Sequence, residues 1–243
     1  MKNIITVLAL LAFLSSCDAK KIDNDTPAVV DSTMGIIDNS KVGIVDENID
    51  PKGSFEGRIT FQLILQTTAD KKKYQPLKDV FGDTLVCTYS KGRYAMQYTG
   101  GKVEYIKYLR DNAQYRKMKY LDTLYYQNAA IENSTIYSIL DEKSDFQVLG
   151  RNLRMVSIVT DKFKKYYYYD PNMYMNPEYF KKHTYGYENK YYEKAKAPYL
   201  YAEIEYDDLK IILKPISIEE MEIDDIFFRM PNYVITNSPV TGE

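Results

Sequence analysis

Two cysteines and one histidine are the only thiols and the only imidazole of this 243-residue sequence, and a thiol activated by an imidazole is one arrangement for nucleophilic catalysis. A catalytic cysteine needs a neighbouring base to hold its thiolate, and His183 is the single imidazole. Cys87 lies in the strand-like run 84–89, and His183 follows two lysines near the expected end of a short helix, where the helix dipole favours a basic residue. We therefore expect a buried, inert thiol at Cys87 and no Cys87–His183 catalytic pair.

Adjacent acidic residues occur at three places: Asp207-Asp208, Glu219-Glu220 and Asp224-Asp225. Two carboxylates hydrolyse glycosidic bonds when they face each other across a cleft about 5–10 Å wide. Neighbouring acids in a turn point mostly into solvent, so this spacing favours surface carboxylates. The sequence also has no histidine pair, glycine-rich phosphate loop or Gly-x-Ser-x-Gly turn. We predict no catalytic residue, no metal site and no cofactor, and hence a protein that is not an enzyme.

The apolar run 4–14, broken by Thr6, follows a positive charge at Lys2. A membrane-spanning helix needs about 20 apolar residues, so this run is too short to span a bilayer. Its length and position are typical of a secretory signal peptide.

The run ends in Leu14-Ser15-Ser16-Cys17, which resembles the lipobox of bacterial lipoproteins. The resemblance implies cleavage after Ser16, attachment of diacylglycerol to the Cys17 thiol and acylation of the new N-terminus. Two or three acyl chains anchor a protein stably, because each buried CH₂ contributes about 0.8 kcal/mol. We expect an extracytoplasmic protein bound to the membrane through lipid at Cys17, in the outer membrane with a periplasmic or surface-exposed face. The charged residues of 18–25 resemble surface-display signals of some bacteria, whereas an Asp beside the Cys resembles an inner-membrane retention signal, and both alternatives stay open.

Charge and cysteine usage restrict the partners of such a protein. The chain has 32 Lys and Arg against 34 Asp and Glu, a net charge of −2. Removal of residues 1–16 takes away Lys2 and lowers this to −3. The mixed basic and aromatic run 162–169 could stack on single-stranded nucleic acid. However, an exported chain with a net negative charge is badly placed to meet nucleic acid, and a tyrosine-rich β-strand explains the run, so we expect no nucleic-acid partner.

With Cys17 acylated, Cys87 has no partner for a disulfide.

Composition divides the chain into four parts. Residues 1–16 form the signal peptide, and 17–52, rich in Asp, Lys, Asn, Pro and Ser, form the lipidated Cys17 and a flexible tether. Residues 53–233 form a single β-rich domain, and 234–243 form a loose tail.

Alternation of apolar and polar residues dominates the β-rich part and predicts an antiparallel meander. The strand-like runs are 59–66, 85–89, 93–98, 103–109, 115–120, 146–148, 152–160, 164–169, 200–206 and 209–213. Pro215 is expected to mark an edge or the end of the last strand. Asn176 before Pro177 and Glu178 is a helix-start pattern, so we predict short helices over 177–182 and 188–196.

This order of elements resembles the lipoprotein-carrier (LolA-type) half-barrel superfamily, and within it the family named for a GLPGLI motif. The resemblance extends over roughly 57–231. It is carried by 146–150, by the tyrosine-rich run ending at Asp170, by Ala197-Pro198-Tyr199-Leu200 and by 225–231. It implies a mainly β (α+β) fold, a strongly curved antiparallel sheet with one or two short helices over its concave face. The cover is expected within 174–196, since an open apolar face would aggregate.

From these features we expect a lipid-anchored cell-envelope protein that binds an apolar or amphipathic ligand, or an envelope protein, in or on a half-barrel. The alternative is a surface adhesion or glycan-contacting module that uses exposed tyrosines. In addition, Asp83-Thr84-Leu85 and Asp122-Thr123-Leu124 resemble the acceptor pattern of bacterial O-glycosylation, which would modify Thr84 or Thr123.

Overall fold

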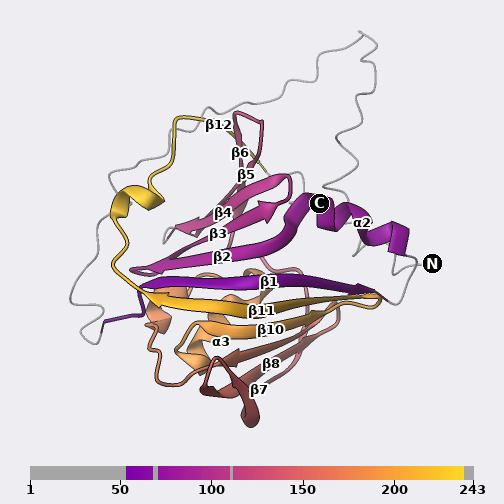
Figure 1. Ribbon diagram of the computed structural model, residues 1–243, viewed down its shortest axis with the longest axis vertical. Coiled ribbons are helices and arrows are strands. Elements are labelled where there is room, and N and C mark those ends of the chain that lie inside the picture. Colours follow the sequence, from indigo (N-terminus) through magenta and orange to yellow (C-terminus); the bar gives the residue numbers. More distant parts are fainter. Residues whose placement is uncertain (1–52, 68–70, 110–111, 238–243) are drawn as a thin grey trace.

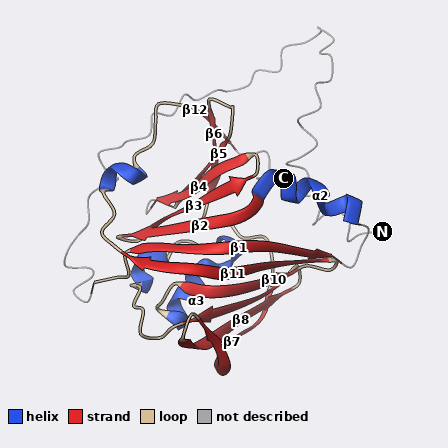
Figure 2. Ribbon diagram, viewed as in Figure 1, coloured by secondary structure: helices blue, strands red, loops and turns tan. Residues whose placement is uncertain are grey.

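The computed structural model describes residues 53–67, 71–109 and 112–237, with no side chains described for 71–75. The expected signal peptide, the tether and Cys17 lie outside these ranges. Within them the protein is mainly β, one curved sheet with a few short helices (Figures 1 and 2), which confirms the predicted fold class. None of the described helices has the length and apolar character needed to cross a membrane.

The strands and helices follow one another with short connections. The strands are β1 (Gly57–Thr67), β2 (Gly82–Ser90), β3 (Arg93–Gly100), β4 (Val103–Leu109), β5 (Ala113–Met118), β6 (Thr123–Asn128), β7 (Ile136–Val148), β8 (Arg151–Thr160), β9 (Lys164–Tyr169), β10 (Tyr199–Glu205), β11 (Leu209–Glu220) and β12 (Val234–Asn237). The helices are α2 (Lys71–Phe81), α3 (Glu188–Ala195) and the 3₁₀ turns η3 (Pro177–Phe180), η4 (Tyr185–Tyr187) and η5 (Asp225–Phe228).

Two meanders share the sheet and meet at its centre. The strand order is β12-β6-β5-β4-β3-β2-β1-β11-β10-β9-β8-β7. The pairing of β1 with β11 therefore joins the meander β1–β6 to the meander β7–β11. Every described pairing is antiparallel except that of β12 with β6. The sequence predicted the local hairpins, and the long-range β1–β11 pairing makes them one sheet.

The connection from β6 to β7 requires this sheet to curve. Ten strand spacings separate β6 from β7, which is about 48 Å across a flat sheet. The seven residues 129–135 that join them reach at most about 27 Å. The two ends of the sheet therefore have to turn toward each other, and the sheet becomes a half-barrel.

The inner face of the half-barrel carries Ile59, Phe61, Cys87 and Tyr94, which belong to the main hydrophobic core. Over these side chains lies a cover, residues 173–197, which contains η3, η4 and α3 (Figure 1). This confirms the expected position of the cover within 174–196. The outer face of β3 to β6 is covered instead by the C-terminal segment around η5, whose Phe228 is fully buried.

Several elements differ from the sequence prediction. Helix α2 was not expected, because its sequence has Pro76 inside it and no acidic residue in its first turn. Strand β6 was also missed, and β7 begins at Ile136 instead of residue 146. The helix expected over 177–182 is the shorter 3₁₀ turn η3, capped as predicted by the Asn176 side chain, which accepts from the backbone N–H of Glu178.

Two corrections concern strand ends. Pro215 does not end β11, because the register shifts by one residue there and Ile216 is left without a partner, which accommodates a residue lacking an N–H donor. The expected loose tail 234–243 is partly ordered: Val234–Asn237 pairs with β6 as β12, and the remaining residues lie outside the described ranges.

Candidate functional site

The inner face beneath the cover is filled by the protein's own rings. Phe180 of η3 stacks on Tyr192 of α3 with ring centroids 3.8 Å apart, and Tyr94 stacks on Tyr108 at 5.3 Å. Phe180, Tyr108 and Tyr192 are each at most 1% exposed. This part of the half-barrel is a packed core.

Polar contacts fix the cover to the sheet. The Lys165 ammonium on β9 donates to the backbone carbonyl of Gly186 at 2.7 Å and lies 3.4 Å from the Glu188 carboxylate. Tyr167 donates to the same carboxylate at 2.7 Å. The backbone N–H of the same Gly186 donates to Glu132 of the β6–β7 connection. The cover is therefore tied to the meander β7–β11 and to the connection that precedes it.

His183 belongs to this packed core. It is fully buried, its Nε2 lies 2.8 Å from the Tyr94 hydroxyl oxygen, and its ring stacks on Tyr108 at 4.4 Å. Burial lowers the pKa of the imidazole from 6.5 to about 4. The neutral histidine thus has a structural role, and a tertiary contact rather than a helix end explains its position.

Cys87 is a free, buried thiol, as the sequence predicted. Burial raises its pKa to about 12, although the hydroxyls of Tyr199 and Tyr89 oppose the shift. The His183 ring contacts Tyr94 and Tyr108, whereas the Cys87 thiol contacts Tyr199 and Tyr89. A thiol with this pKa is not a nucleophile at neutral pH.

The three acidic pairs serve the structure. Asp224 caps η5 by accepting from the Ile226 N–H at 2.8 Å, and Asp225 accepts from the buried Arg93 at 2.5 Å. Asp208 contributes its backbone carbonyl to Thr67, and Glu220 lies 3.8 Å from Arg151. Among the described residues, no group of three or more His, Cys, Asp or Glu side chains is placed to hold a metal ion.

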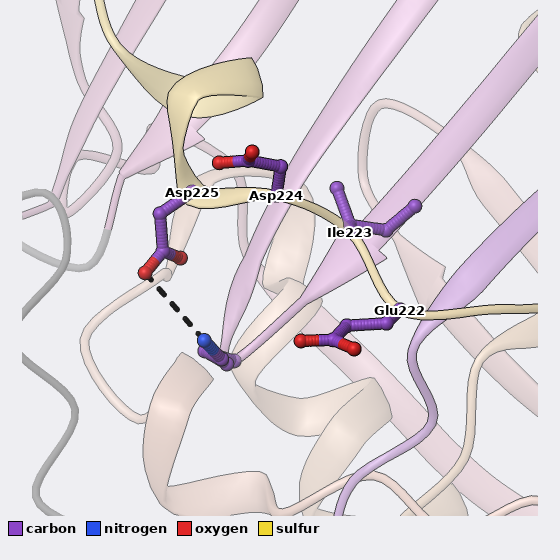
Figure 3. A pocket seen from close by; sticks show the side chains of 5 residues that line it. Glu222, Ile223, Asp224 and Asp225 are labelled. Atoms are coloured by element: carbon purple, nitrogen blue, oxygen red, sulfur yellow. Dashed lines mark ion pairs between the residues drawn. The ribbon is translucent and has the colours of Figure 1, made fainter.

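An open hollow of about 450 Å³ lies beside two of these acids (Figure 3). Its walls are Lys91, Glu222, Ile223, Asp224 and Asp225, and the ion pair of Lys91 with Asp225 closes one side at 3.5 Å. Ligand sites are mostly apolar with a few polar groups, whereas these walls are mostly charged, Asp224 caps η5, and Asp225 pairs with Lys91 and Arg93. The hollow therefore lies where the ion pair of Lys91 with Asp225 holds η5 against the β2–β3 turn.

A row of half-buried side chains crosses the inner face next to the packed core. The register aligns Met96 of β3 with Ile106 of β4, Ile106 with Arg116 of β5, and Arg116 with Tyr125 of β6. Each is neither fully buried nor fully exposed. We call these four residues the inner row.

The inner row lies between the cover and α2. Along β3, Tyr94 is under the cover, Met96 is in the row, and Tyr98 contacts Phe81 of α2 with ring centroids 5.2 Å apart. Along β1, Phe61 is in the main core, the half-buried Leu63 packs against that core, and Leu65 packs in the cluster of Leu77 from α2. Figure 2 shows α2 at one end of β1 and the short helices at the other. The inner row is the part of the inner face that neither covering element fully buries.

Arg116 is the charged member of the inner row. Its guanidinium lies over the Tyr125 ring, 5.6 Å from the centroid. Burial lowers its pKa to about 10, and the neighbouring hydroxyls of Tyr185, Tyr125 and Tyr98 oppose this shift, so the group is cationic at neutral pH. No pattern in the sequence indicates this arrangement, because Arg116 is one of many charged residues in alternating strands. The register alone brings it beside Ile106 and Tyr125.

A second cluster of rings lies on the outer face. Phe146 of β7 has its centroid 4.9 Å from those of Tyr168 on β9 and Tyr201 on β10. Phe146 is 36% exposed, and the Tyr201 hydroxyl donates to Glu203 at 2.7 Å. We call Phe146, Tyr168 and Tyr201 the outer cluster.

The two threonines of the expected glycosylation pattern are both half-buried. Thr84 on β2 donates its hydroxyl to Asp83 at 3.1 Å, and Thr123 begins β6, where it pairs with Val234 of β12.

No protein-family model matches this sequence, and no curated protein matches it. Two crystal structures of PNGF-II, in space groups C2 and P21, are similar in part. They superpose with TM-scores of 0.45 and 0.41 at 10% and 8% identity, over 76% and 75% of this chain. The chain spans about a third of the PNGF-II chains, 31% and 32%. Similarity of this size assigns no function.

Proposed function

We propose that this protein is a non-enzymatic, lipid-anchored binding protein of the bacterial cell envelope. It holds an apolar or amphipathic ligand along the inner row of a LolA-like half-barrel. The observation that carries this proposal is the row itself, in which half-buried apolar side chains line the inner face between two covering elements.

The shape of the inner face supports a ligand at this place. Beneath the cover the face is filled by Phe180, Tyr192 and their neighbours, so a ligand has no room there. Along the inner row, Met96 and Ile106 keep part of their apolar surface in water, and a bound chain would remove it. From β3 to β6 the row crosses about 14 Å of sheet, a suitable length for part of an extended hydrocarbon chain.

The sequence supports the anchor and the compartment. The apolar run 4–14 followed by Leu14-Ser15-Ser16-Cys17 predicts export and acylation of Cys17. A non-catalytic role is supported by the inert environments of Cys87 and His183 and by the structural roles of the acidic pairs.

Native mass spectrometry of the full chain with Cys17→Ala tests the binding proposal. This substitution removes the expected site of the protein's own acyl groups, so a retained lipid has to be a ligand. We expect a mass adduct that dissociates as a lipid, and we expect it to be lost in Ile106→Trp, which fills the row.

The control for this experiment is Gln97→Trp, which adds a ring to the exposed outer face of the neighbouring strand β3. It should keep the adduct. A folded protein that carries no lipid and takes up none of an added fatty acid, alcohol or phospholipid would contradict the proposal.

The outer cluster favours a second candidate function, contact with a glycan. Three neighbouring rings beside the Glu203 carboxylate combine a surface for a sugar face with a hydrogen-bond acceptor. A glycan array probed with the full chain and with Tyr168→Ala tests it. Binding that is lost in the variant would support this function, and silence of both proteins would exclude it for the glycans on the array.

A further inference from the structure

One aromatic side chain of the cover, Tyr185 of η4, is 41% exposed although the cover as a whole packs on the core. We infer that Tyr185 determines the specificity of the inner row: its ring lies over the row and restricts the ligand to a single unbranched hydrocarbon chain. This inference rests on the proposed function, and it names the ligand class and a specificity-determining residue of the same site.

The first argument is that the backbone around Tyr185 is held in place. The N–H of Tyr185 donates to the carbonyl of Ala129, which follows β6, at 2.9 Å. The next residue, Gly186, donates its N–H to Glu132 and accepts from the Lys165 ammonium through its carbonyl. These contacts fix the point from which the ring projects, so the exposed ring cannot move away together with its backbone.

The second argument is the direction of the Tyr185 side chain. Burial lowers the pKa of Arg116 in the row, and the Tyr185 hydroxyl opposes this shift. Burial raises the pKa of Tyr206, which packs in the cluster of Leu77 from α2, and the Tyr185 hydroxyl adds to that shift. A hydroxyl that influences both groups lies between the row and the cluster beneath α2. The side chain therefore extends from the cover across the row.

The third argument is the width of the row. On β3, Met96 lies between Tyr94, which is under the cover, and Tyr98, which contacts Phe81 of α2. Side chains on one face of a strand repeat about every 7 Å, a spacing that suits one hydrocarbon chain, since non-bonded carbon atoms need about 4 Å. A second chain beside the first would lie over Tyr94 or Tyr98, where the covering elements already pack.

The ring and the row together explain the preference for an unbranched chain. Ile106 and Met96 form the floor, and the flat Tyr185 ring offers apolar contact from above while its hydroxyl stays near polar groups. A branch on the ligand would have to displace this ring, whose backbone is fixed. Forcing extra methylene groups into a packed site is unfavourable, so a branched ligand should bind more weakly.

Two isomeric acids test the inference on the full chain with Cys17→Ala. Dodecanoate has one unbranched chain, and 2-butyloctanoate carries the same atoms as two shorter chains; each is titrated below its micelle concentration and followed by calorimetry. We expect the parent protein to bind dodecanoate about tenfold more tightly, the usual effect of a misplaced methylene group. In Tyr185→Ala this preference should disappear, mainly because 2-butyloctanoate binds more tightly.

Three further variants separate the ring at this position from a general effect of substitution. Tyr185→Phe keeps the ring and should keep the preference for dodecanoate. Tyr185→Leu, which has a smaller side chain, should weaken the preference, and it replaces Tyr185→Ala as the test if that variant does not fold. Tyr120→Ala removes a ring that is 98% exposed in the turn between β5 and β6, and it should leave both affinities unchanged. Thermal unfolding of each variant establishes that it is folded.

The outcomes distinguish the inference from the function on which it rests. Equal binding of the two isomers by the parent protein would overturn the inference and leave the binding function intact. A preference for dodecanoate that persists unchanged in the folded Tyr185→Ala or Tyr185→Leu protein would overturn the role of Tyr185. Failure of both acids to bind the folded parent protein would overturn the proposed function itself.

Discussion

The Nε2 atom of His183 in the cover lies 2.8 Å from the hydroxyl oxygen of Tyr94 on β3, and the two rings stack with centroids 5.8 Å apart. The single histidine of the sequence therefore joins the cover to the sheet. Its surroundings are aromatic, since the ring of Tyr108 also stacks on it at 4.4 Å, and the charged groups that influence it are Glu188 and Lys165.

This contact makes stability depend on pH. Burial lowers the pKa of His183 to about 4, whereas the unfolded chain binds the proton near 6.5. Between these values the unfolded state holds more protons than the folded state. The free energy of unfolding therefore decreases as the pH falls from about 6.5 to about 4, and below about 4 protonation of His183 causes no further decrease. The expected loss is about 3 kcal/mol.

Urea unfolding at pH 7.0, 5.5 and 4.5 measures this dependence in the parent protein and in His183→Gln. The variant should be less stable at pH 7.0 and should have a flatter dependence over the same range. Equal pH dependence in the two proteins would show that the histidine is not responsible.

Thiol labelling reports on both cysteines. Because the pKa of Cys87 is raised to about 12, it should resist a thiol reagent at pH 8 while the protein is folded. After unfolding, the chain isolated from membranes should show one reactive thiol if Cys17 is acylated, and none in Cys87→Ser. Rapid labelling of the folded protein would contradict the burial of Cys87, and two thiols after unfolding would contradict acylation of Cys17.

The aromatic packing of the cover should contribute strongly to stability. Phe180 is fully buried and stacks on Tyr192 at 3.8 Å, so Phe180→Ala removes a ring from a close-packed site. We expect it to reduce the free energy of unfolding by about 3–5 kcal/mol. The control is Phe146→Ala in the outer cluster, where the ring is 36% exposed and the expected loss is about 1 kcal/mol. Similar losses in a chemical denaturation experiment would mean that the cover is not part of the core.

The sequence predicts the local features of this fold well. The alternation along β1 is visible, and the turn between β2 and β3 is marked by Lys91 and Gly92, both of which adopt positive φ. Within the cover, η3 begins at the Asn176-Pro177 pattern that predicted a helix start. These features depend on neighbouring residues, so the sequence alone contains them.

What the sequence could not predict depends on long-range pairing. β12 exists because Val234–Asn237 reaches β6, more than a hundred residues earlier in the chain. The inner row exists because three strand registers bring Met96, Ile106, Arg116 and Tyr125 side by side. A shift of one residue in any of these strands would turn its member of the row to the other face, which is why no pattern in the sequence indicated Arg116.

Methyl NMR of the protein labelled at methionine tests binding along the inner row most directly. Met96 is in the row, whereas Met155 of β8 lies on the outer face opposite Tyr168. Each signal is assigned by a Met→Leu substitution at that position, and dodecanoate is added to the full chain carrying Cys17→Ala. We predict a saturable shift of the Met96 signal with the Met155 signal unmoved. Binding that shifts Met155 and leaves Met96 unchanged would contradict a ligand site on the inner face.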